Sequence, residues 1–539
     1  MNEILDNNFK EFYPKISTAL KEASFIGIDC EFTGINHQSI PHATLFDSMQ
    51  QHYDKLRRNI ESYIAVQIGI TAFKKLQHEN VYIATPFSFY LQPKTIPTGV
   101  DREFRWQVTA IQFLKTHKFD FNKASYDGIS YLNNQDEINL QNYLKKNEYA
   151  DNGACLITLD EENFFFNTID RVKKWIKNSP SNENTIEIEC NDYIQFCCIQ
   201  KYLRNSFNNI WTEPLDNKFL VIKVTQETRS ILEEKDNNSL ENKLMDYCMG
   251  FTKIFKLLKS LKKPIVGHNL LLDLMFMYQQ FYEPLPVKYT NFKKEINQIY
   301  PTVYDTKVLS YEMKKITKKD TWKSNSLEGL YTYFKDDEGR FLVGNSPRIH
   351  FQNSEIINEK IFHDAGWDSF YTGYCFVKIA HVYASKKRGG VVAMKDFTHA
   401  ELIASIQDYK NCVNLIRGNC PYMRLDGPDP ISSRPPRLNF ETRNSKSLNM
   451  IQVIDALSSF ESVAIQPYTK TSVLIAPSNY RTAREILQHF EKNKNYCVST
   501  FSPLKHSPVI RSLLWSSLVL SGSLLTWLIH QTVKKPTIT

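Results

Sequence analysis

The chain has 539 residues, of which 42% are hydrophobic, 13% aromatic and 23% charged. This length is too great for one ordinary core, so we expect two to four domains, and this composition excludes a largely disordered chain. The net charge of +8 is modest and is not gathered into one arginine-rich arm, so the charge alone does not argue for a nucleic-acid partner.

The cysteines and the N-terminal residues indicate a chain that faces the cytosol. The ten cysteines form no CxxC pair, and the first residues have neither the basic nor the apolar region of a secretion signal. We therefore expect reduced thiols.

The N-terminal part of the chain alternates strand and helix patterns. Residues 25–32 (FIGIDCEF), 62–73 and 80–91 are apolar segments of strand length, and residues 42–61 have helical spacing. This succession predicts an α/β sheet.

Two acids, Asp29 and Glu31, interrupt the apolar strand at 25–32. Alternate residues of a strand point the same way, so both carboxylates project from one face. Two carboxylates that close repel each other unless a cation lies between them. Two interpretations remain open at this point: a metal site, or two acids at a strand end that face solvent.

A second α/β region follows, and the first pattern then resumes. Residues 161–228 contain a helical stretch and two strand-like segments, which predict a small insert. Residues 264–281 return to the first pattern. From about 391 to 500 we expect another small α/β unit, with a helix at 401–416, strands at 463–468 and 472–477, and a helix at 482–492.

The C-terminal region contains an apolar run from Ser512 to Ile529 without a charged residue. That length is close to what a transmembrane helix needs, and Trp515 and Trp527 near its ends suit the two membrane interfaces. The alternative is a buried C-terminal helix. We favour a membrane span, which predicts a tail-anchored protein with its other domains in the cytosol.

Two further acids and a histidine are also candidate site residues. Asp273 lies within the apolar run LLLDLMFM, where a carboxylate needs a basic or metal partner, and His363 precedes Asp368 by five residues. Three aspartates and a glutamate are hard oxygen ligands that suit two Mg²⁺ or Mn²⁺ ions. Two such ions can clamp the attacking and leaving oxygens of a phosphodiester, and a neutral histidine can take a proton from water.

These motifs, in this chain order, resemble the DEDD exonuclease superfamily in its histidine subtype, and more narrowly the poly(A)-specific ribonuclease (PARN) family. The resemblance is carried by DCEFTGI at 29–35, GHNLLLDLM at 267–275 and HDAGWDSFYTGYCF at 363–376. It implies an RNase H-like α/β fold, with Asp29, Glu31, Asp273 and Asp368 as metal ligands and His363 as the general base. It also implies that Phe32 and Ile35 bind the 3′-terminal nucleotides.

The resemblance also implies a domain order. The exonuclease domain would occupy residues 1–160 and 229–390, interrupted at 161–228 by an insert similar to the Arg-xxx-His nucleic-acid-binding domain. An RRM-like domain (391–500), a linker (501–510), a transmembrane helix (511–530) and a tail (531–539) would follow. The insert lacks the Arg-xxx-His pair, which argues against RNA binding through that signature. No tryptophan lies between Trp367 and Trp515, so 5′-cap recognition by the RRM-like domain is not supported.

These departures and the C-terminal span make the chain most similar to the membrane-anchored PARN-like domain-containing proteins, the pre-piRNA Trimmer type. That resemblance implies a metal-dependent 3′-to-5′ exonuclease that trims pre-piRNAs on the cytosolic side of the mitochondrial outer membrane, with the endoplasmic reticulum as the alternative. The implied partners are RNA 3′ ends, a PIWI-clade Argonaute, a Tudor-domain adaptor and a second copy of the chain. Two other hypotheses remain: a general poly(A)-specific deadenylase, and a membrane-tethered RNA-binding scaffold without catalysis.

Overall fold

The computed structural model describes most of the chain. The described residues are 1–96, 102–146, 159–178, 184–190, 193–215, 218–236, 240–317, 322–341, 344–352, 361–389, 396–432, 434–444, 447–460 and 463–533. Residues 534–539 of the expected tail lie outside them. The chain forms two compact units: unit 1 is Met1–Pro41, Tyr53–Leu415 and Tyr422–Pro428, and unit 2 is His42–His52, Ile416–Pro421 and Asp429–Thr539.

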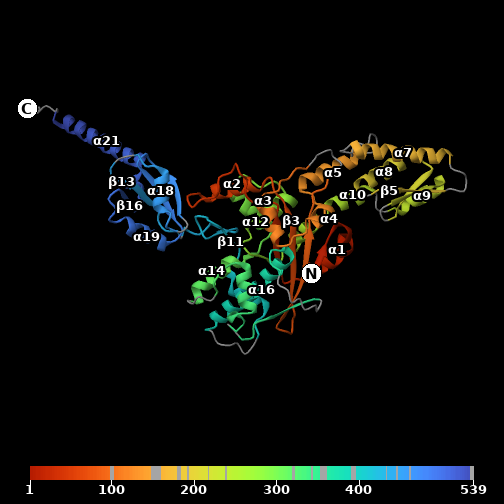
Figure 1. Cartoon of the computed structure of the whole chain (residues 1–539), viewed down its shortest axis with the longest axis horizontal. Helices are drawn as coiled ribbons and strands as arrows, with labels where there is room; N and C mark the ends of the chain where they lie inside the picture. Colours follow the sequence, from red (N-terminus) through yellow and green to blue (C-terminus); the bar gives the residue numbers. More distant parts are fainter. Residues whose placement is uncertain are drawn as a thin grey trace, which may run out of the picture. The chain divides into compact units, whose positions relative to one another are not determined.

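Unit 1 is built on a mixed seven-stranded sheet (Figure 1), which confirms the expected α/β class. The strand order is β1-β4-β3-β2-β8-β9, and β10 also pairs with β4. The strands are β1 (Asn2–Ile4), β2 (Phe25–Phe32), β3 (Ala65–Lys75), β4 (Val81–Tyr90), β8 (Ile265–Gly267), β9 (Val303–Asp305) and β10 (Arg348–Phe351).

Strand β2 lies inside this sheet and is covered on both faces. It pairs antiparallel with β3 and parallel with β8. Phe25, Ile26 and Ile28 are at most 1% exposed, so the apolar residues of the segment are those that a two-sided core requires. The acids of this strand are therefore held by a rigid support.

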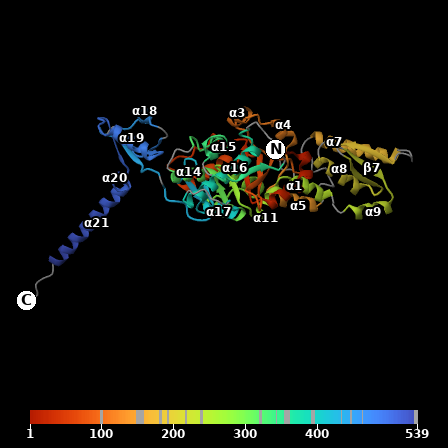
Figure 2. The ribbon, with the colours of Figure 1, turned by 90° about the horizontal axis from the view of Figure 1, so that it is seen from below.

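Helix α16 (Ala365–Lys387) packs directly on β2 and β3. A Cβ atom at Gly69 would lie 1.7 Å from the Ala365 carbonyl oxygen, and one at Gly27 would lie 2.3 Å from that of Ser369. Only glycine allows the backbones to approach so closely, so Gly27 and Gly69 let the first turns of α16 pack directly on the two strands. Figure 2 shows α14 (Thr306–Thr317), α15 (Leu327–Lys335) and α17 (His399–Ser405) grouped around α16, and each contacts it.

Outside the insert, the described residues of unit 1 also form α1 (Asp6–Glu22), α3 (Val108–Thr116), α4 (Phe121–Asp127), α5 (Asn134–Lys146), α10 (Leu240–Met249), α11 (Thr252–Leu261), α12 (Leu271–Phe281) and α13 (Tyr289–Ile299). Helix α2 (Met49–Ile60) begins in the segment His42–His52, which is assigned to unit 2, and continues in unit 1. Residues 42–48, which we expected at the start of a helix, precede α2.

The insert consists of α7 (Leu159–Asn178), β5 (Thr185–Glu189), α8 (Tyr193–Ser206), β6 (Ile210–Leu215), β7 (Lys218–Lys223) and α9 (Gln226–Lys235). Its strands form an antiparallel sheet in the order β5-β7-β6. Its core is shared with neighbouring helices, because Phe165 and Ile199 belong to one apolar cluster with Leu140 of α5 and Leu244 of α10.

Unit 1 extends past residue 390, where we expected the next domain to begin. Phe397, Leu402 and Ile406 are buried in the same cluster as α16, because α17 packs against that helix. The hairpin of β11 (Cys412–Asn414) and β12 (Tyr422–Arg424) follows, and Asn411 exchanges hydrogen bonds with Val303 beside β9.

Unit 2 contains a four-stranded antiparallel sheet in the order β14-β15-β13-β16. In chain order the elements are β13 (Leu438–Thr442), α18 (Met450–Leu457), β14 (Val463–Pro467), β15 (Ser472–Pro477), α19 (Tyr480–Phe490) and β16 (Tyr496–Thr500). Phe440, Ile475, Val453 and Ile486 meet in one core between the sheet and the two helices.

Unit 2 ends in the short helix α20 (Pro503–His506) and the long helix α21 (Pro508–Val533). Within the described residues, α21 is the one helix long and apolar enough to cross a membrane: residues Pro508–His530 have a mean hydropathy of 1.6. None of its most apolar stretch is buried against the protein. This exposure argues against the alternative of a buried core helix.

Candidate active site

Three of the predicted acids meet where α16 crosses β2. Asp29 and Glu31 project from one face of β2, and Asp368 lies in the first turn of α16. One carboxylate oxygen from each lies within 4.8 Å of the other two. Glu31 and Asp368 are only 8% and 7% exposed, so water has little access to the carboxylates of this acid cluster.

Asp273 approaches the acid cluster from α12 but lies outside that group of three. Asp273 is 6% exposed, and the polar thiol of Cys30 on β2 interacts with its carboxylate. Its charge acts on Asp29. The fourth predicted acid is therefore close to the others, although it contributes no oxygen within the 4.8 Å limit.

Asp305 fixes the loop that precedes α12. Its buried carboxylate accepts hydrogen bonds from the backbone N–H groups of Asn269 and Leu270 at 2.9 and 3.1 Å, and from that of Asn414 at 2.9 Å. The sequence analysis did not assign this residue. The signal that could have found it is an aspartate that ends an apolar strand pattern in TVYD.

The electrostatics of the acid cluster and the nearby Asp273 disfavour four negative charges without a positive partner. Burial, followed by the charges of Asp368 and Asp273, holds the pKa of Asp29 well above its usual value. Burial and the charge of Asp368 do the same to the pKa of Glu31. Burial raises the pKa of Asp368 to about 8. A positive ion among these carboxylates would relieve both the desolvation and the repulsion.

The donor set fits a divalent metal ion. Within the described residues, Oδ1 of Asp368 is buried and has no hydrogen-bond partner, whereas its Oδ2 accepts from the His363 backbone N–H at 3.1 Å. A buried carboxylate oxygen without a donor is costly unless another positive group meets it. Three carboxylates at this spacing offer the hard oxygen ligands that Mg²⁺ and Mn²⁺ prefer.

Gln67 ties α16 to the sheet beside the acid cluster, and the sequence analysis missed it. It pairs with Glu31 across β2 and β3 and is fully buried. Its amide donates to Oδ2 of Asp364 at 2.8 Å and accepts from the Ala365 N–H at 3.2 Å. These bonds hold the residues at the start of α16, three positions before Asp368.

His363 lies next to the acid cluster, but its ring packs elsewhere. Its backbone has a positive φ of 61°. Its ring lies against α3 and the residue after it, with centroid distances of 4.9 Å to Phe113 and 4.0 Å to His117. Burial and the neighbouring His117 lower the pKa of His363, which favours the neutral ring.

The two residues expected to bind the RNA end lie just beyond the acids. Phe32 stacks on Phe276 of α12 at 4.3 Å. Ile35 is 39% exposed, and its backbone N–H donates to Gln107 at 3.2 Å. Ile35 is therefore exposed, whereas the Phe32 ring is partly buried against α12.

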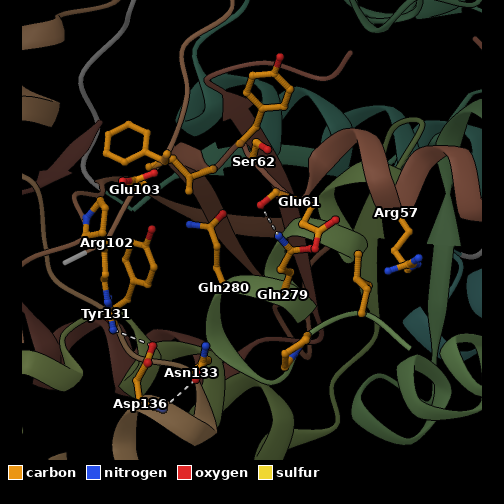
Figure 3. A pocket seen from close by; sticks show the side chains of 16 residues that line it. Arg57, Glu61, Ser62, Arg102, Glu103, Tyr131, Asn133, Asp136, Gln279 and Gln280 are labelled. Carbon is orange, nitrogen blue, oxygen red and sulfur yellow. Dashed lines mark hydrogen bonds and ion pairs between the residues drawn. The ribbon is translucent and has the colours of Figure 1, made fainter. Parts of the chain in front are cut away.

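The cavity of about 400 Å³ in Figure 3 is separate from the acid cluster. The Gln280 side chain points into it and Arg102 pairs with Asp136 at its rim at 2.7 Å. None of the predicted site residues lines this cavity.

The sheet, the crossing helix and the gathered carboxylates are features of an α/β nuclease, and comparison with known proteins agrees. The sequence model of the CAF1 family ribonucleases matches residues 4–376. The chain belongs to the CAF1 ribonuclease family. The expected resemblance to the poly(A)-specific ribonuclease (PARN) family is confirmed by the curated relatives, which include PARN of Xenopus laevis at 27% identity over 93% of this chain and 80% of that protein.

Individual proteins to which the chain is similar include two curated proteins and one solved structure. The chain is 33% identical to the pre-piRNA 3′-exonuclease trimmer of Bombyx mori, with 99% of each chain covered. It is 28% identical to the poly(A)-specific ribonuclease PNLDC1 of Mus musculus, with 94% of this chain and 95% of that protein covered. The Mg²⁺- and Mn²⁺-bound structure of S. pombe Pop2p is 12% identical with a TM-score of 0.36, covering 73% of this chain and 95% of that one.

Proposed function

We propose that the chain is a metal-dependent 3′-to-5′ RNA exonuclease that trims the 3′ ends of pre-piRNAs held by a PIWI-clade Argonaute. The observation that carries this proposal is the meeting of Asp29, Glu31 and Asp368 within 4.8 Å in a CAF1-family chain. The substrate is inferred from the trimmer of Bombyx mori, to which the chain is similar over 99% of its length.

In this proposal Asp29, Glu31, Asp368 and Asp273 would together hold two divalent metal ions. Two bound Mg²⁺ or Mn²⁺ ions would activate the attacking water and stabilise the oxygen that leaves. His363 would accept the proton of that water, for which its neutral ring is suited. Phe32 and Ile35 would hold the terminal nucleotides so that the last phosphodiester lies at the acids.

The small domains and the anchor are part of the same proposal. The βαββαβ order and the strand arrangement of unit 2 support an RRM-like domain, and the helices and antiparallel sheet of the insert support a relative of the Arg-xxx-His domain. We propose that α21 anchors the chain in the mitochondrial outer membrane, with the endoplasmic reticulum as the alternative location.

A general poly(A)-specific deadenylase is the second candidate, because the similar mouse protein PNLDC1 carries the name of a poly(A)-specific ribonuclease. The two candidates differ in their substrates. A deadenylase digests free oligo(A) much faster than other tails, whereas a trimmer acts best on an extended RNA that a PIWI protein presents. A comparison of initial rates on these RNAs separates them.

The decisive test compares the wild type with Asp29→Asn on 3′-extended RNA, either free or bound to a PIWI protein, in Mg²⁺. We expect the variant to lose at least about a hundredfold in rate, because one ligand of the metal site is removed. Asp408→Asn, an exposed acid outside the acid cluster, serves as the control. Equal shortening of the RNA by the wild type and by Asp29→Asn would contradict catalysis at this site and would favour the non-catalytic scaffold.

A further inference from the structure

The four-stranded sheet of unit 2 is joined to α21, the last helix of the same unit, almost without a linker. After β16, the short helix α20 folds back on the sheet: the His506 ring accepts from the Ser502 N–H at 3.0 Å and lies 3.4 Å from the Ser499 hydroxyl. Ser507 is the single residue between α20 and α21, and its hydroxyl accepts from the Ile510 N–H at 3.3 Å. His506, which contacts Ser499 of β16, is thus separated from α21 by Ser507 alone.

This short connection limits how far unit 2 can lie from a membrane that α21 spans. The uncharged run begins at Ser512, after Arg511. The helix rises about 7.5 Å between Ser507 and Ser512, and the headgroup layer on each side of a bilayer is of similar thickness, roughly 5–8 Å. The α20 side of unit 2 is therefore at the level of the lipid headgroups.

This part of the chain is also basic. Residues 429–511 contain 11 Lys and Arg against 6 Asp and Glu, a net charge of +5, while residues 1–428 contain 53 against 52. Three exposed basic residues lie at or near the junction. Lys505 is on α20, Arg511 is in the first turn of α21, and the backbone carbonyl of Arg437 accepts from the Phe501 N–H at 2.8 Å. The guanidinium of Arg437 is exposed, donates to the Phe46 carbonyl at 3.4 Å and lies over the Phe46 ring. Basic residues next to a membrane span attract anionic lipids.

The sheet of unit 2 is poorly suited to bind RNA on its outer face. Asn439 and Leu474 alternate with core residues and point to that face, yet they are only 1% and 6% exposed. The Phe501 ring packs on the rings of Tyr468 and His506, with centroid distances of 5.4 and 5.6 Å. The segment that leads to α20 therefore helps to cover the outer face of the sheet. The outward positions of the four strands, all of which the structure describes, carry no aromatic residue on which a base could stack.

We propose that unit 2 docks, through Arg437, Lys505 and Arg511 around α20, on the anionic phospholipid headgroups of the membrane that α21 spans. This inference rests on the proposed anchor but not on the proposed nuclease activity. Docking would fix unit 2 against the bilayer instead of leaving it free to turn on α21, because several charges would bind the surface at once.

The test uses the full chain reconstituted in vesicles of phosphatidylcholine alone, or of phosphatidylcholine with phosphatidylserine. Backbone hydrogen exchange is measured for the amides of Arg437 and Leu438, and for those of residues 501–507 other than Pro503. We expect phosphatidylserine to slow exchange in both segments by roughly an order of magnitude, because each basic residue near the surface adds to the attraction. High salt should remove the difference.

Matched variants identify the surface. The double variant Arg437→Gln with Lys505→Gln should lose the effect of phosphatidylserine, whereas Arg481→Gln with Arg484→Gln, exposed on α19, should keep it. Equal exchange of the wild type in both kinds of vesicle overturns the inference, as does protection of these segments by single-stranded RNA in neutral vesicles. Release of the chain by alkaline carbonate would overturn the anchor and this inference together, while the exonuclease rate on free RNA tests the proposed activity separately.

Discussion

At the scale of single residues, the charge of the acid cluster links metal binding to stability. Burial raises the pKa of Asp273 to about 7 and that of Asp368 to about 8. Unfolded aspartates titrate at about pH 4, so between roughly pH 4 and 8 the folded, metal-free protein binds more protons than the unfolded chain. Its stability is therefore greatest at the acid end of this range and is lost as the pH rises through the raised pKa values.

We therefore predict that the metal-free protein unfolds at a lower temperature at about pH 8 than at about pH 6, since each unit of pKa shift corresponds to about 1.4 kcal/mol. Adding Mg²⁺ should raise the unfolding temperature, and more so at the higher pH, because the ionised carboxylates bind the ion. Scanning calorimetry with chelator or with Mg²⁺ checks this. Glu31→Gln should weaken both effects, and an identical pH slope in that variant would contradict the prediction.

The residues that sequence alone could identify are those whose chemistry conflicts with their surroundings. Asp29 and Glu31 stand out in an apolar strand, and Asp273 stands out among leucines and methionines. Gln67 could not be found this way, because an amide in a strand raises no such conflict, and its partner Asp364 is 297 positions away. The direction of the His363 ring depends on α3, a contact that no local pattern predicts.

At the scale of elements, the prediction of a helix at 401–416 was wrong for the second half of that segment. Helix α17 ends at Ser405, and residues Cys412–Asn414 form a strand. Asn411 has a positive φ of 60°, and its bonds to Val303 join this segment to β9. Long-range pairing overrode a helical pattern here, whereas the strands of the central sheet, apolar on both sides, followed their sequence closely.

The placement of α16 on β3 leads to the second prediction. Gln67 and Thr71 both join β3 to α16, but Gln67 bonds at the start of the helix, next to the acids, and Thr71 bonds to Ser369 at 2.7 Å. In Gln67→Met the first turn of α16 loses its anchor, so Asp368 shifts relative to Asp29. We expect kcat to fall by about ten- to a hundredfold, with a smaller change in KM.

Thr71→Val is the matched control, because it removes a buried hydrogen bond between the same two elements. Each variant should lose about 1–3 kcal/mol of stability, measured by denaturant unfolding, but Thr71→Val should keep a kcat close to that of the wild type. If both variants lost the same fraction of kcat, the effect would reflect general loosening of α16 instead of a role for Gln67.

At the scale of the whole molecule, the net positive charge and the acid cluster lie in different parts of the chain. Residues 429–539 carry 13 Lys and Arg against 6 Asp and Glu, which is +7 of the total of +8, although the acid cluster lies in unit 1. The nuclease unit is therefore nearly neutral overall and has little long-range attraction for a free RNA strand. Such a unit suits a 3′ end that is brought to it.

The last prediction concerns the anchor. Removing residues 508–539 should leave the initial rate on free RNA unchanged within about twofold, but should reduce trimming of RNA tethered to the same vesicles by about a hundredfold, because the tether supplies the effective concentration. An unrelated tail-anchor helix in place of α21 should restore the rate on tethered RNA. Equal rates on tethered RNA with and without the helix would show that α21 does not act by confining the enzyme to the surface that holds its substrate.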